Sequence, residues 1–124
     1  LADQTFASAK LDPADFATEE ARAQLGAFRD LAALRRSLVW PLTAGRYEGS
    51  RLERAGDVLA LTWRFAAGPL VLVLNAGAHP TSLAPPEGCA GRAPDAALGA
   101  VVEGADGRLS LPPFCAALWS RAAA

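Results

Sequence analysis

The hydrophobic period of this sequence changes at Trp40 and Pro41, and the change limits what can form on either side. Before this point the apolar residues recur at spacings of three and four, which places them along one face of a helix. The recurring residues are Ala21, Leu25, Phe28, Leu31, Ala32, Leu34 and Leu38. Because a proline disfavours helical geometry at the residue before it, the sequence predicts an amphipathic helix that ends by about Val39.

Both ends of this helix carry the residue types that helix ends prefer. Thr18 can cap the first turn with its hydroxyl, and Glu19 and Glu20 place negative charge where the helix dipole favours it. Arg35 and Arg36 place positive charge near the exposed carbonyls of the last turn. The helix is therefore the strongest single element that the sequence predicts.

After Pro41 the apolar residues recur at every second position, which is the period of a strand. The segment GDVLALTWRF places four large residues on one face, namely Leu59, Leu61, Trp63 and Phe65. The segment PLVLVLN at 69–75 is an unbroken apolar run, which predicts a strand buried on both faces. The residues AAG at 66–68 predict a tight connection between these two strands.

Weaker strand signals, separated by turn residues, occur at 46–54, 97–104, 107–111 and 114–121. Residues 1–17 show no period and are expected to be extended, whereas 79–95, with four prolines and two glycines, predicts the longest irregular loop. Short strands with turns between them are typical of an antiparallel sandwich. The expected fold class is mainly β, a small antiparallel β-sandwich at 41–124 preceded by one amphipathic α-helix within 1–40.

The composition excludes several classes of protein. The 124 residues suffice for one domain, and a hydrophobic fraction of 52% can fill a core. A formal net charge of -1 leaves no electrostatic footprint for nucleic acid or an anionic membrane surface. No apolar run approaches the roughly 20 residues of a membrane span, and the first residues do not resemble a signal peptide. We therefore expect a soluble, cytoplasmic domain cut from a longer protein.

Residues that could support metal or nucleophilic chemistry are sparse. Cys89 and Cys115 are the only cysteines, lie far apart without a metal-ligand spacing, and are expected to be free thiols rather than a disulfide. His79 is the only histidine, so a zinc site would lack a ligand, and no serine lies in a nucleophile elbow. No glycine-rich phosphate loop occurs. The sequence predicts no metal, no cofactor and no catalytic residue.

The acidic residues do not form an evident catalytic pair. A glycosidase needs two carboxylates on rigid elements that face one cleft. Here the acids stand singly on expected turns or helix starts, at Asp12, Asp15, Glu48, Glu53, Asp57, Glu87, Asp95, Glu103 and Asp106. Such settings favour a solvated surface over catalysis.

Aromatic residues are the remaining candidates, because flat rings can stack on the apolar faces of sugars. Trp63 shares a face with large apolar residues, and Trp119 lies in an apolar strand, so both are assigned to the core. Trp40, at a helix end, is also expected to be buried. Tyr47, in a polar setting, is the best surface candidate, and Trp40 and Tyr47 are the weak candidates for substrate binding.

Several segments resemble one enzyme family. They are TFASAKLD at 5–12, LAALRR at 31–36, Pro41 and LPPFCAALWSR at 111–121. In this order they resemble the C-terminal end of α-amylase superfamily enzymes, glycoside hydrolase family 13, and most of all the malto-oligosyltrehalose trehalohydrolases. Ala9 and Pro13 depart from the family pattern, which usually has serine and tryptophan at these positions.

The resemblance implies a noncatalytic role for this chain. In such enzymes the helix completes a catalytic (β/α)8 barrel and the sandwich follows directly, while the catalytic carboxylates lie upstream and none maps here. The parent would hydrolyse the α-1,4 bond next to the terminal trehalose of maltooligosyl trehalose, and the barrel would be the partner of this domain. Alternatives are a carbohydrate-binding module for maltooligosaccharide, or the same domain of another superfamily member such as a branching enzyme. The apolar stripe of the helix could also pair with a second copy.

Overall fold

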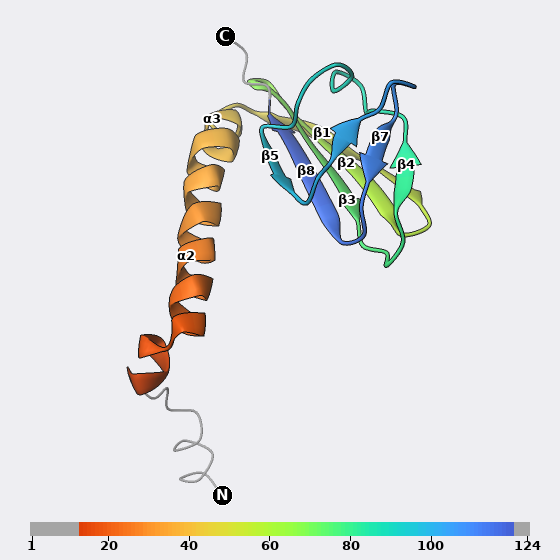
Figure 1. Ribbon diagram of the computed structural model, residues 1–124. Helices are drawn as coiled ribbons and strands as arrows, with labels where there is room; N and C mark the ends of the chain where they lie inside the picture. The colour runs from red at the N-terminus through yellow and green to blue at the C-terminus, as the bar shows by residue number, and fades with distance from the viewer. Residues whose placement is uncertain (1–12, 121–124) are drawn as a thin grey trace, which may run out of the picture. The chain divides into compact units, whose positions relative to one another are not determined.

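The computed structural model describes residues 13–120 of the chain, so the segment TFASAKLD lies outside the described residues. The chain separates into two compact units, Leu1–Leu34 and Arg35–Ala124, and each is described by itself. The first contains a short 3-10 helix, η1 (Pro13–Ala17), and the long helix α2 (Glu19–Leu34). The second contains all the strands that the described residues form (Figure 1).

Helix α2 begins where the sequence predicts. The Thr18 hydroxyl oxygen accepts a hydrogen bond from the backbone N–H of Ala21 at 3.1 Å, which caps the first turn. No residue of α2 is buried, and Phe28 and Leu31 of its apolar stripe are 69% and 65% exposed. Within the described residues of its unit, most of the apolar face of this helix is therefore exposed.

Helical structure continues past its expected end. A π-helical turn, η2 (Arg35–Val39), follows α2, and a four-residue helix, α3 (Trp40–Thr43), follows η2. Pro41 lies in the first turn of α3, where its missing N–H removes no bond because the first donors of a helix have no partner within it. The expectation that helical structure ends by Val39 is therefore wrong.

Among the described residues, eight strands form two antiparallel sheets (Figure 1). The larger sheet has the order β1-β2-β3-β8-β5 and the smaller one the order β4-β7-β6. The strands are β1 (Tyr47–Ala55), β2 (Val58–Phe65), β3 (Gly68–Asn75), β4 (Thr81–Leu83), β5 (Ala96–Leu98), β6 (Val102–Glu103), β7 (Leu109–Leu111) and β8 (Cys115–Ser120). The expected fold class, a small antiparallel sandwich preceded by a helix, is confirmed.

Three local expectations need correction. The residues of η1 (Pro13–Ala17) are helical, although the sequence predicts that they are extended. Strand β4 interrupts the segment 79–95, which the sequence predicts to be irregular. The segment 97–104 is not one strand, because it contributes to β5 in one sheet and β6 in the other. The strands β4, β5 and β6 have only two or three residues each, which is too short for an alternating pattern to be recognised among the neighbouring prolines and glycines.

The core lies between the two sheets. Its largest members from the five-stranded sheet are Trp119, Val73 and Val71, and Leu109 and Leu111 of β7 pack against them. The β2 side chains that belong to this inner face are Val58, Ala60 and Thr62, because they stand opposite Asn75, Val73 and Val71 of β3. Trp119 is confirmed as a core residue, since only 1% of it is exposed.

Trp63 and its neighbours on β2 lie on the other face of the sheet, so their assignment to the core is wrong. Trp63 pairs with Leu70 and Leu61 with Leu72, and both β2 residues are only partly buried. Alternation along β2 is present as predicted, but the smaller side chains face the core. Alternation along a strand indicates which residues share a face. It does not indicate which of the two faces packs against the core.

Asn75, at the end of β3, ties the two sheets together and is 1% exposed. Its amide nitrogen donates hydrogen bonds to the carbonyl of Leu111 at 3.3 Å and to that of Pro112 at 2.9 Å. The same nitrogen donates to the carbonyl of His79 at 2.9 Å, and the amide oxygen accepts the N–H of Gly77 at 2.9 Å. One buried side chain therefore bonds backbone groups of two segments, the turn after β3 and the end of β7.

Replacing Asn75 is expected to destabilise the sandwich strongly. Asn75→Ala leaves buried carbonyls and one N–H without partners, which should lower the free energy of unfolding by about 3 kcal/mol. Urea denaturation followed by tryptophan fluorescence measures this change. Ser110→Ala, at an exposed position of β7, is the control and should change stability by less than about 0.5 kcal/mol. A loss for Asn75→Ala no larger than for Ser110→Ala would contradict the proposed tie.

Candidate functional site

The outer face of the five-stranded sheet, on the side away from the core, is mainly apolar. The register places these side chains on it: Leu52 of β1; Leu59, Leu61, Trp63 and Phe65 of β2; Leu70, Leu72 and Leu74 of β3; Ala116 and Leu118 of β8; and Ala96 and Leu98 of β5. We call this set the outer face. Its one charged position in these strands is Arg54, at the β1 edge. Leu52 and Leu98, near its two edges, are 60% and 69% exposed.

One end of the outer face is covered within the unit. The Ser120 hydroxyl donates a hydrogen bond to the carbonyl of Leu38 in η2 at 2.8 Å, and α3 contacts β3. Leu42 of α3 is fully buried, and Leu70, which pairs with Ser120, is 7% exposed. Farther along the strands, Leu61, Leu72, Leu74 and Leu118 remain only partly buried. The outer face is therefore an apolar surface with cover at one end.

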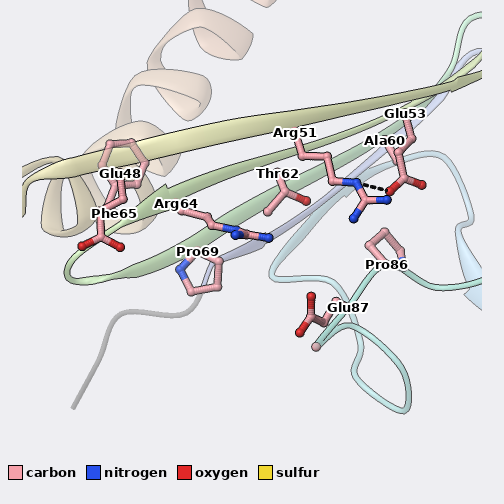
Figure 2. Close-up of a pocket in the computed structure, with 11 residues that line it drawn as sticks. Glu48, Arg51, Glu53, Ala60, Thr62, Arg64, Phe65, Pro69, Pro86 and Glu87 are labelled. Carbon is pink, nitrogen blue, oxygen red and sulfur yellow. Dashed lines mark ion pairs between the residues drawn. The ribbon is translucent and has the colours of Figure 1, made fainter.

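A groove of about 470 Å³ lies on the opposite side of β1 and β2. Its floor is formed by inward residues of these strands, and its far wall by Pro86, Glu87 and Gly88 of the loop after β4 (Figure 2). Figure 2 shows Arg64 and Thr62 rising from β2, with Glu87 on the loop opposite them. The loop is held over the core because the Trp119 indole N–H donates to the Arg92 carbonyl at 3.1 Å.

The groove contains both paired and unpaired charges. Arg51 Nε lies 2.8 Å from Glu53 Oε1, and Arg46 pairs with Glu48 at 3.5 Å. Within the described part of the chain, Arg64 and Glu87 form no ion pair or side-chain hydrogen bond. Among residues 13–120, Arg64 and Glu87 are thus the unpaired cation and anion that line this groove, beside apolar atoms of Pro69 and Pro86. A neutral ligand with donors and acceptors would match it better than an ion.

The weak candidates for sugar binding are both exposed. Trp40 is 55% exposed, so the expectation that it is buried is wrong, and the Arg36 guanidinium carbon lies 5.7 Å from its ring centroid. Tyr47 is 54% exposed and packs edge-on against Phe65, with ring centroids 5.8 Å apart. Trp40 is thus engaged by a cation and Tyr47 by another ring. Neither lines the groove.

The acidic residues are exposed as expected, at Glu48, Glu53, Asp57, Glu87, Asp95, Glu103 and Asp106. The Asp12 and Asp15 side chains lie outside the described residues. The structure nevertheless brings Glu48, Glu53 and Glu87 to one groove, which the sequence did not predict. Glu87 is separated from β1 by more than thirty positions, and no local signal in the sequence relates the two. Arg64 and Thr62 show only the ordinary alternation of a strand.

The two cysteines are buried free thiols. Cys89 belongs to the same core cluster as Cys115 and is 1% exposed. Burial raises the pKa of the Cys89 thiol, against a smaller opposing effect of Arg92. In the described residues no group of three or more His, Cys, Asp or Glu side chains could hold a metal ion, and no helix there is long and apolar enough to cross a membrane.

Comparison with protein-family models, with curated proteins and with solved structures finds no match to this chain.

The raised pKa of Cys89 predicts a loss of stability in alkali. Above the ordinary thiol pKa of 9.0, the unfolded chain ionises while the folded chain still holds the proton. The unfolded state then binds fewer protons, so the free energy of unfolding falls as pH rises. Denaturation from pH 8 to 11 should show this fall in a Tyr47→Phe background, which removes the phenol, and Cys89→Ala should reduce its slope. An unchanged slope in Cys89→Ala would contradict the assignment.

Proposed function

We propose that this chain is a noncatalytic C-terminal domain of an α-amylase superfamily glycoside hydrolase, most similar to malto-oligosyltrehalose trehalohydrolase, and that it stabilises the catalytic barrel. The observation that carries the proposal is the outer face, on which the larger apolar side chains of β2 lie. A sheet that turns Leu61 and Trp63 away from its own core is suited to burial against another domain. The parent enzyme would hydrolyse maltooligosyl trehalose and release trehalose.

Two further observations support this proposal. The order of elements, a long amphipathic helix followed directly by an antiparallel sandwich, is the order that the resemblance implies. The acidic residues of the second unit, which carries the strands, are exposed and lie on strands, turns and loops, which is compatible with a noncatalytic domain. A branching enzyme parent is equally compatible with both observations, because specificity resides in barrel loops.

The proposal predicts different effects of Leu98→Lys in two settings. The coding sequence upstream of Leu1 should encode barrel strands with catalytic carboxylates. In that extended protein Leu98→Lys should cost about 1.5 to 3 kcal/mol, the contribution of a buried leucine, and lower the midpoint of thermal unfolding. In the 124-residue chain, where Leu98 is 69% exposed, the free energy of unfolding should change by less than about 0.5 kcal/mol.

Val102→Lys is the matched control, because Val102 is 58% exposed but lies on β6 of the smaller sheet. It should have little effect in either protein. The purified 124-residue chain should also leave maltooligosyl trehalose intact. Turnover by this chain, or equal effects of the two substitutions in the extended protein, would contradict the proposal.

The groove supports a second candidate function, the binding of a neutral oligosaccharide. A sugar hydroxyl can donate to the free Glu87 carboxylate and accept from the free Arg64 guanidinium, whereas a charged ligand would leave one of the two unbalanced. Pro69 and Pro86 supply apolar surface for the C–H face of a sugar ring. The observation that supports this second function is that Arg64 and Glu87 have no ion-pair partner among the described residues.

Calorimetric titration with maltooligosaccharide tests the groove. Arg64→Ala and Glu87→Ala should each raise the dissociation constant about tenfold, because each removes a hydrogen bond to a charged group. Arg54→Ala, on the other face of the sheet, should leave it unchanged. Tryptophan fluorescence in the same titration reports on the three tryptophans together, and comparison with Trp40→Phe isolates the part that comes from Trp40. Absence of heat at millimolar sugar, or equal binding by all variants, would rule out this candidate.

A further inference from the structure

Strand β1 is an open edge of the five-stranded sheet. It stands first in the strand order and pairs only with β2 among the strands that the structure describes. An edge strand presents a row of unpaired N–H and C=O groups, which can add another strand. The edge is nine residues long and contains no proline, so its backbone is open to pairing.

The regular part of β1 is symmetric about Leu52. A bulge interrupts the ladder between Tyr47 and Gly49, and a turn follows Ala55, so regular pairing covers residues 49–55. Leu52 is the central residue of this stretch. Arg51 and Glu53, one position to either side of it, point to the groove face, while Leu52 lies on the outer face and is 60% exposed.

We propose that two copies of this chain pair through β1, antiparallel and related by a two-fold axis, with Leu52 of one copy opposite Leu52 of the second copy. In this register Arg51 of each copy stands opposite Glu53 of the other. All seven regular residues of β1 find a partner, from Gly49 against Ala55 to Ala55 against Gly49. Two-fold pairing of this kind uses the same surface on both copies, as most homodimers do.

The charges of β1 select this register over its neighbours. Side chains directly opposite each other across an antiparallel pair must share a face, so alternative registers shift by two residues. One such shift places Arg51 opposite Arg51, and the other places Glu53 opposite Glu53. Like charges directly opposite are destabilising, whereas opposite charges contribute about 0.2 to 1 kcal/mol per pair. Only the register centred on Leu52 joins unlike charges at both symmetric positions.

Charged side chains on an edge usually prevent association. Here the Arg51–Glu53 pair at 2.8 Å is already neutral within one copy, so a second copy can approach without net repulsion. In the dimer the four groups form one network of alternating sign. Leu52 gains an apolar neighbour, because the two outer faces become continuous across the new pair of strands.

Charge exchange tests this inference by sedimentation equilibrium. Arg51→Glu should weaken the dimer about tenfold or more, since it sets two carboxylates opposite each other twice. Glu53→Arg should weaken it similarly by opposing guanidinium groups. The double variant Arg51→Glu/Glu53→Arg restores both the pair within a copy and the pairs between copies, and it should dimerise within about threefold of the original chain.

Two controls separate this surface from the rest of the chain. Arg29→Glu on α2 makes the same change of net charge and should leave the dimer intact. Phe28→Lys alters the apolar stripe of α2, and loss of the dimer in this variant but not in Arg51→Glu would assign association to the helix and overturn the inference. A chain that stays monomeric to roughly 1 mM, or a double variant as weak as the single ones, would overturn it as well.

Hydrogen exchange gives an independent readout. The outward amides within residues 49–55 should exchange more slowly as protein concentration rises, while the amides of β5, at the other edge, should not change. Equal rates for β1 at low and high concentration in a chain that does dimerise would place the contact elsewhere. Because Leu98→Lys leaves β1 untouched, failure of this inference is distinguishable from failure of the barrel-docking proposal.

Discussion

The arrangement of the sandwich depends on the buried amide of Asn75. β3 is the middle strand of the larger sheet, and Asn75 binds its end to the carbonyls of Leu111 and Pro112, where β7 leaves the smaller sheet and turns toward β8. A buried amide without partners would be costly, so these bonds fix one relative position of the two sheets. The backbone at Gly77 also packs closely against the Asp57 side chain. An added Cβ at this position would lie 2.7 Å from Asp57 Oδ2.

The two sheets that Asn75 joins differ in the length of their strands. The smaller sheet has strands of two or three residues, whereas β1, β2 and β3 have eight or nine. The smaller sheet meets Val71, Val73 and Trp119 at the centre, while the inner positions of β1 and β2 farther out open into the groove. The groove and its charges are thus a consequence of sheet size. Arg51, Glu53 and Arg64 can occupy inward positions because those positions retain access to water.

The sequence predicted most helices and strands correctly, but it did not predict which of their faces are buried. Local patterns identified α2, the β2–β3 hairpin and β8, since each is long enough for its period or its turn residues to show. The face of β2 that is covered could not be read from its alternation, and Trp63 was assigned to the core for that reason. Trp40 was expected at a buried helix end, but helical structure continues through η2 and α3 past Pro41, and Trp40 is 55% exposed. The groove was missed because it joins β2 to Glu87 across the fold.

The two surfaces proposed for association are compatible because they use different parts of the same sheet. Pairing at β1 occupies the backbone of an edge, while the outer face consists of side chains that project perpendicular to the strands. A dimer through β1 would leave Leu61, Leu72 and Leu118 uncovered, and would extend their surface past Leu52 into the second copy. If the barrel of each parent chain covers the outer face of its own copy, the backbone edge of β1 still remains free for pairing, because the two surfaces do not overlap. The edge joins seven residues per copy, so the dimer of the 124-residue chain depends on a single row of contacts.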